Sequence, residues 1–108
     1  MSFLLFVSFE ANAKVYRCND ERDNAYTVSI NLQKGEVVAL EEGTVIDSEA
    51  GKFECSTTSY GRGAIGNQTQ CDFVINSGEQ LGSITVLESG RAYYQLYIAD
   101  RNFRGRCH

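Results

Sequence analysis

A strand–turn–strand pattern over residues 81–99 constrains the fold of this chain more than any other feature. Two runs rich in β-branched and aromatic residues flank residues 88–91, where Gly90 can adopt the positive φ of a tight turn. Alternation along the second run predicts an inward and an outward set, Tyr94, Leu96 and Ile98 against Tyr93, Gln95 and Tyr97. Because an isolated hairpin with this much apolar surface is only marginally stable, other strands must cover it.

The remainder of the chain supplies further short strands. Turn residues recur about every 8 to 12 residues, which is typical of an all-β sandwich or barrel, and no apolar period of 3.6 residues is sustained. The predicted strands are 14–18, 25–32, 37–40, 44–47, 52–58, 69–76, 81–87 and 92–99, with a turn at 48–51. We therefore expect a small antiparallel barrel or sandwich of about eight short, mostly sequential strands.

Four widely spaced cysteines predict two disulfide bonds. A structural zinc site normally takes its ligands as close pairs, and this chain has no Cys-x-x-Cys pair. Of the three possible connectivities we favour Cys55 with Cys71, which closes a local excursion, and Cys18 with Cys107, which joins the start of the fold to its end. The alternative is four buried thiols in a reducing compartment. Because 108 residues enclose a small core, two cross-links would contribute much of the stability.

Residues 1–13 are predicted to be a signal peptide. A short apolar run at 3–9 is followed by Ala11-Asn12-Ala13, a small-x-small pattern suited to cleavage after Ala13. No Lys or Arg precedes the run, so a longer leader upstream and a first strand packed on the domain both stay open. We expect a single domain over 14–108, secreted or periplasmic, with no integral membrane segment.

Charge is unevenly distributed along the chain. The formal net charge of −4 gives no reason to expect nucleic acid as a partner. Acidic residues dominate the middle of the chain and arginines its end, namely Glu41, Glu42, Asp47, Glu49 and Glu54 against Arg101, Arg104 and Arg106. The polar run at 19–24 lacks the glycine of an EF-hand calcium loop and is expected to be a solvated turn. The sequence predicts no metal site and no cofactor.

A catalytic set is difficult to assemble from these residues. The single histidine is His108, which an arrangement of Ser or Cys with His would have to use. Paired carboxylates for glycoside hydrolysis remain an alternative, although acidic residues beside turns are usually solvated. The glycine-rich run at 60–67 has the spacing Gly-x-Gly-x-x-Gly but lacks the strand-to-helix context of a nucleotide site. We predict a non-enzymatic protein in which this run is a recognition loop.

The candidate binding residues lie in this loop and in the C-terminal hairpin. They are Ser89, Arg91, Tyr93, Tyr97 and Arg62. Tyrosine and arginine are enriched at binding hot spots, and an exposed tyrosine face could stack on a sugar, a base or a partner side chain. The alternative, which is slightly favoured, is that the tyrosines pack under a loop or cover the end of the barrel.

Two short segments resemble a known family. Tyr16-Arg17-Cys18 and Ser89-Gly90-Arg91-Ala92-Tyr93 are similar to parts of the small periplasmic inhibitors of c-type lysozyme. The resemblance implies an exported β-barrel whose Ser-Gly loop enters the lysozyme cleft. It covers about a tenth of the chain, and the second, lysine-bearing loop of that family has no counterpart here, so the chain is not assigned to it.

The leading functional hypothesis is an exported, non-catalytic binding module for a macromolecule, either a protein or a glycan, that is a monomer or a weak oligomer. Three alternatives stay open: an inhibitor of a secreted hydrolase such as a lysozyme, a structural envelope component, and a carbohydrate-active enzyme.

Overall fold

Eight antiparallel strands make up most of the chain. The computed structural model describes residues 14–59 and 66–108, and 72% of them are in strands. The strands are β1 (Val15–Asn19), β2 (Tyr26–Asn31), β3 (Glu36–Glu41), β4 (Thr44–Ser59), β5 (Asn67–Ile75), β6 (Gln80–Leu87), β7 (Ala92–Ile98) and β8 (Arg101–Cys107). The predicted signal peptide at 1–13 and Arg62 lie outside the described residues.

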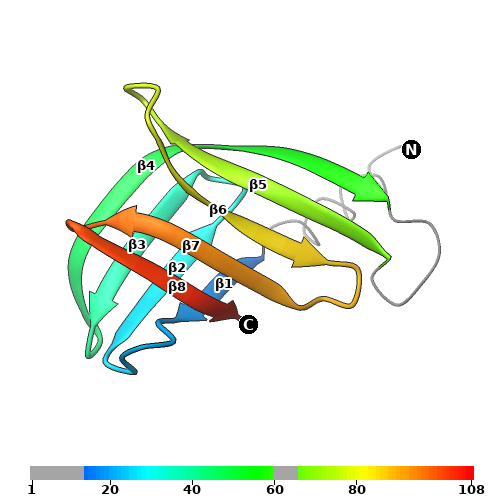
Figure 1. The fold of residues 1–108 in the computed structure, drawn as a ribbon. Helices are drawn as coiled ribbons and strands as arrows, with labels where there is room; N and C mark the ends of the chain where they lie inside the picture. The colour runs from blue at the N-terminus through cyan, green and yellow to red at the C-terminus, as the bar shows by residue number, and fades with distance from the viewer. Residues whose placement is uncertain (1–13, 60–65) are drawn as a thin grey trace, which may run out of the picture.

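The strands form a closed barrel in sequential order, β1 to β8 (Figure 1). Each strand pairs antiparallel with the next, and β1 returns to pair with β8 at Cys18 and Cys107. Beyond β1 the chain continues beside β8, where the Glu21 amide donates to the Arg104 carbonyl at 2.9 Å. The all-β expectation is confirmed, and the structure selects the barrel over the sandwich.

The barrel interior holds inward-facing apolar residues of every strand except β4, which has no fully buried residue. On β7 the inward set predicted from the sequence is buried, since Tyr94, Leu96 and Ile98 are at most 4% exposed. Phe73 of β5 and Phe103 of β8 are fully buried beside it. The remaining buried apolar residues are Cys18, Val28, Ile30, Val37, Ala39, Cys71, Ile84, Ala92 and Cys107.

The predicted turn at 48–51 is wrong, because β4 runs through it without reversing. The first half of β4 pairs with β3 and the second half, from Gly51, pairs with β5 (Figure 1). A Cβ at Gly51 would overlap the carbonyl oxygen of Val74, and the Gly51 amide donates to the Gly35 carbonyl at 2.8 Å. Gly51 therefore permits a close backbone approach where β4 changes partner, which is a second common use of glycine in strands.

The prediction from sequence also missed β8, because it described this segment only as basic. Charged residues alternate there with Phe103, Gly105 and Cys107, and the last of these is 7% exposed. The strand count of eight agrees with expectation because one strand was split in two and another was overlooked.

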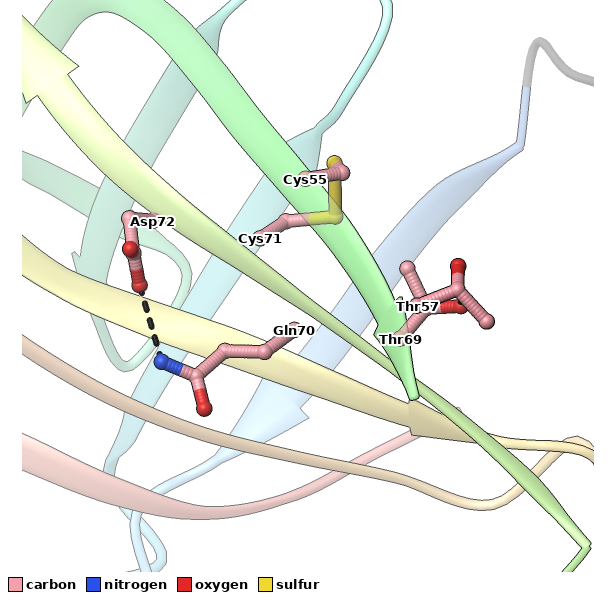
Figure 2. The surroundings of a disulfide bond; sticks show 6 residues. All are labelled: Cys55, Thr57, Thr69, Gln70, Cys71 and Asp72. Carbon is pink, nitrogen blue, oxygen red and sulfur yellow. Dashed lines mark hydrogen bonds between the residues drawn. A yellow bond between two sulfur atoms is a disulfide. The ribbon is translucent and has the colours of Figure 1, made fainter. Parts of the chain in front are cut away.

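Both predicted disulfides are present, Cys18–Cys107 and Cys55–Cys71. Each joins directly opposed residues of neighbouring strands. Figure 2 shows Cys55–Cys71 between β4 and β5, with Thr57 and Thr69 beyond it, their hydroxyls 2.9 Å apart. Cys18, Cys71 and Cys107 are buried, whereas Cys55 is exposed.

The run at 19–24 is not the fully solvated turn expected from its composition. Asp20 is 1% exposed, and its carboxylate lies 3.5 Å from Nε of Arg22 and 3.5 Å from a terminal nitrogen of Arg101. The Arg101 guanidinium in turn covers the Tyr26 ring at 3.8 Å from its centroid. The two guanidinium groups offset part of the hydration that this carboxylate loses on burial. The run also extends the seam between β1 and β8, through the hydrogen bond from Glu21 to Arg104.

Among the described residues, no helix is long and apolar enough to cross a membrane.

Candidate binding face

The outward side chains of β7 are exposed, as the hairpin hypothesis required. Tyr93 is 38% exposed and Tyr97 48% exposed. The slightly favoured alternative, in which both tyrosines are covered, is therefore wrong for these two residues. With inward Tyr94 and Leu96 buried, β7 presents one face to the core and one solvent-facing surface that carries both tyrosines and Gln95.

Polar and cationic residues of β6 and β8 flank the tyrosines in register. Tyr93 lies between Thr85 of β6 and Arg106 of β8. Two residues further along β7, Gln95 lies between Ser83 of β6 and Arg104 of β8. Two residues beyond that, Tyr97 opposes Asn102 of β8. Directly opposed residues of antiparallel strands point to the same side, so these rows form one outer surface, here called the β7 face.

A recess of about 190 Å³ lies at one end of the β7 face. Its lining residues are Arg91, Ala92, Tyr93, Arg106, Cys107 and His108. The polar groups available to a ligand are thus two guanidinium groups, a phenol and an imidazole. Guanidinium groups donate several hydrogen bonds in one plane and accept none, so the recess suits an anion.

The turn between β6 and β7 carries Ser89 and Arg91 beside this recess. Gly90 adopts φ 95°, and the Leu87 amide donates to the Arg91 carbonyl at 2.8 Å, which closes the turn. The Glu88 amide donates to the Asn67 carbonyl at 2.9 Å. This contact brings the end of the glycine-rich run next to the turn, although Arg62 lies outside the described residues.

The structure brings only some of the predicted residues together. Arg91 and Tyr93 line the same recess, while Ser89 is exposed on the turn outside it. Tyr97 lines a different recess, which it shares with Asp47 and Glu49 of β4. At that end, the Ala99 amide donates to Oδ2 of Asp47 at 3.2 Å. Tyr97 therefore extends the β7 face toward acidic surroundings.

Ion pairing divides the arginines around this face into two groups. Arg104 is 2.7 Å from Glu21, and Arg22 and Arg101 flank Asp20. Within the described part of the chain, Arg91 and Arg106 have no carboxylate within 4.0 Å of their nitrogens. The two arginines that line the recess are thus the ones whose charges are not already matched.

Arg17 joins this group through closure of the barrel, which sequence reasoning missed. Its backbone amide donates to the His108 carbonyl at 3.2 Å, and the His108 amide donates to the Arg17 carbonyl at 2.8 Å. Since Cys18 and Cys107 point inward, Arg17, Arg106 and His108 point outward. The signal that could have revealed this was the predicted Cys18–Cys107 bond, because it places the neighbours of each cysteine on adjacent strands.

The uneven charge of the sequence becomes a separation in space. The arginines of the C-terminal segment lie on β8, and Asp47, Glu49 and Glu54 lie on β4. The separation runs along the β7 face, because Asp47 and Glu49 share a recess with Tyr97, whereas Arg91 and Arg106 line the recess beside Tyr93. A protein of net charge −4 therefore carries a basic patch at the Tyr93 end of this face, away from the acidic residues at its Tyr97 end.

Tyr94 lies directly beneath the β7 face. Burial raises the pKa of its phenol well above the ordinary value, and the nearby Asp20 charge raises it further. Its hydroxyl has no hydrogen-bond partner. Tyr94 is consequently held in its neutral form and serves the core rather than the surface.

The fold and the face together define a class of protein: a small eight-stranded β-barrel with two disulfides and an exposed aromatic and cationic surface. Comparison of the chain with protein-family models, with curated protein sequences and with solved structures finds no match.

Proposed function

We propose that this protein is an exported binding module that recognises a macromolecule through the β7 face. The observation that carries the proposal is the exposure of Tyr93 and Tyr97 on one strand, with Arg91 and Arg106 beside Tyr93. Tyrosine offers a large contact area at a small cost in conformational entropy, and arginine offers directed charge. Two disulfides are consistent with an oxidising compartment and support export.

Binding fits this face better than catalysis does. The recess presents Arg91 and Arg106, and guanidinium groups stay protonated at neutral pH. They can hold and orient an anion but cannot act as general acid or base there. The His108 imidazole is the group in the recess suited to proton transfer, but among the described residues no serine or acidic side chain lines the recess beside it, and Cys107 is held in a disulfide. A rigid barrel also keeps the tyrosines in place before the partner arrives, which reduces the entropy lost on binding.

Partner capture with matched variants tests the proposal. The oxidised domain is immobilised and exposed to an extract of secreted and envelope proteins and glycans, beside Y93A, Y97A and V45S. Val45 is a matched control because it is an exposed apolar residue on β4. We expect one partner to be retained by the wild type and V45S and reduced at least fivefold by Y93A. Equal retention by all four proteins, as a structural envelope component would give, overturns the proposal.

A second candidate is an inhibitor of a secreted hydrolase such as a lysozyme. It is favoured by the exposed Ser89–Gly90 turn at the end of a closed eight-stranded barrel, together with the resemblance of residues 89–93 to lysozyme inhibitors. A turn that protrudes from a rigid barrel is suited to entering a cleft. Inhibition of a panel of lysozymes that is lost in S89Y or R91A would establish this candidate, and no inhibition at micromolar protein would eliminate it.

A further inference from the structure

We propose that Arg17, Arg91 and Arg106 form an anion-binding patch that takes the carboxylates of an acidic protein partner. This inference rests on the proposed function and names the chemistry of its ligand. The patch is assembled from three parts of the chain: β1, the turn before β7, and β8.

The geometry of the barrel seam brings these side chains together. Arg17 and His108 are directly opposed through their two backbone hydrogen bonds, so Arg17 and Arg106 are diagonal neighbours on adjacent strands. Diagonal neighbours are about 7 to 8 Å apart, which is within reach of long side chains. Arg106 in turn opposes Tyr93, and Arg91 completes the same recess.

The charges of the patch are available to a ligand. Arg17, Arg91 and Arg106 are all exposed, and none has a carboxylate within 4.0 Å in the described part of the chain. Glu21, which shares a recess with Arg106, and Glu88, in the turn before Arg91, are already engaged. Glu21 pairs with Arg104, and Oε1 of Glu88 accepts from the Asn67 amide at 3.3 Å. Like charges held together without a counter-charge favour the arrival of an anion.

Carboxylate is the anion that this arrangement fits. A guanidinium binds a carboxylate through two parallel hydrogen bonds, and the Tyr93 ring provides an apolar wall beside the Arg106 site. Three guanidinium groups spread over neighbouring strands match several carboxylates on one surface rather than a single small ion.

Charge distribution favours a protein over an acidic polysaccharide as the source of these carboxylates. A long polyanion that crosses the patch would also approach Glu21, which shares a recess with Arg106, and Glu88, in the turn before Arg91, on a molecule with net charge −4. A folded protein can present a few carboxylates at one point and avoid that repulsion. The Tyr and Arg composition of the β7 face is also that of protein–protein hot spots.

Two probes of equal charge test the proposal, a labelled hexaglutamate peptide and hexagalacturonate, with hexaglutamine as the uncharged control. They are titrated against the oxidised wild type, R17A/R106A and K34A/K52A. Lys34 and Lys52 are exposed, and their replacement removes the same two charges elsewhere on the barrel. Unfolding curves establish that the variants fold, and R17K/R106K tests whether guanidinium geometry matters beyond charge.

We expect hexaglutamate to bind the wild type about tenfold or more tightly than R17A/R106A, with K34A/K52A within about twofold of the wild type. R17K/R106K should lie between them. The proposed patch is overturned if the wild type does not bind hexaglutamate, or if R17A/R106A binds it as tightly as the wild type does. Tighter binding of hexagalacturonate overturns the protein assignment. Concentration-dependent dimerisation that R17A/R106A abolishes would identify the occupant as a second copy of this chain instead.

The capture experiment separates this inference from the proposed function. A partner retained equally by the wild type and R17A/R106A but lost in Y93A leaves the binding module standing and contradicts the patch. Failure of the wild type to retain any partner contradicts the binding module. The hexaglutamate titration then decides only whether the patch binds carboxylates.

Discussion

Arg17 and His108 exchange two backbone hydrogen bonds of 3.2 and 2.8 Å, next to the disulfide that joins Cys18 to Cys107. This one relationship closes the barrel between its first and last strands. It also places an arginine from β1 beside the arginines of β8, so the same contact stabilises the fold and assembles the cationic patch.

Removing the Cys18–Cys107 bond should destabilise the protein more than removing Cys55–Cys71. The two bonds close loops with sequence separations of 89 and 16 residues. Chain-entropy estimates give about 4.5 and about 3 kcal/mol respectively. Urea unfolding of C18A/C107A and C55A/C71A measures both losses, and a larger loss in C55A/C71A would show that barrel closure does not depend on the seam bond.

Mild reduction should open Cys55–Cys71 first. Cys55 is exposed, whereas Cys18 is fully buried and Cys107 is 7% exposed, so a thiolate in solution reaches the β4–β5 bond more readily. Limited reductant followed by alkylation and peptide mass mapping should label Cys55 and Cys71 before the other pair. The reverse order would contradict the closed seam between β1 and β8.

Replacement of Gly105 by alanine should open the seam. A Cβ there would overlap the Asn19 carbonyl oxygen, where the chain after β1 runs beside β8. Forced separation of packed segments typically costs about 1 to 3 kcal/mol. Gly78 is the control, because alanine there enters open space and only its positive φ of 92° is unfavourable. Denaturant unfolding that finds G105A as stable as the wild type would contradict the close approach.

Tyr94 should make the protein lose stability at alkaline pH. Its pKa in the folded state lies above the ordinary value near 10, because burial and Asp20 disfavour the phenolate. Below pH 10 the folded and unfolded states both keep the proton. As the pH rises above 10, the unfolded state releases it first, so the free energy of unfolding falls.

The Y94F variant should therefore unfold with a weaker pH dependence between about pH 10 and 12 than the wild type. It also removes a buried hydroxyl that has no partner, so its stability at neutral pH should be unchanged or higher. Y97F is the control for removal of an exposed tyrosine hydroxyl, since Tyr97 is 48% exposed. Equal slopes in the wild type and Y94F would contradict the buried, neutral phenol.

Local alternation was sufficient to predict most strands. Along β7 the period of two separates Tyr94 and Leu96 from Tyr93 and Tyr97, and the core accepts the first pair as expected. Glycine was a poorer guide, because Gly90 permits a turn whereas Gly51 permits a close approach inside a continuous strand. These two uses of glycine cannot be distinguished from a single sequence, because they differ only in how closely another segment of backbone approaches the glycine.

The candidate face was predicted in part. Arg91 and Tyr93 were identified because they are close in sequence, and Arg17 was missed because it is far from them along the chain. Asp20 was assigned to solvent for the same reason, since its partner Arg101 comes from the last strand.

The sequence by itself determined the all-β character, the C-terminal hairpin and the expectation of two disulfides, because these follow from side-chain alternation, turn chemistry and cysteine number and spacing. It favoured one of three possible cysteine pairings, which the tertiary structure selected. Tertiary structure alone decided that the sheet closes into a barrel, that β4 serves two neighbours, and that Arg17 joins Arg106 beside Tyr93. Those outcomes depend on contacts between residues distant in sequence, which form only when the first and last strands pair.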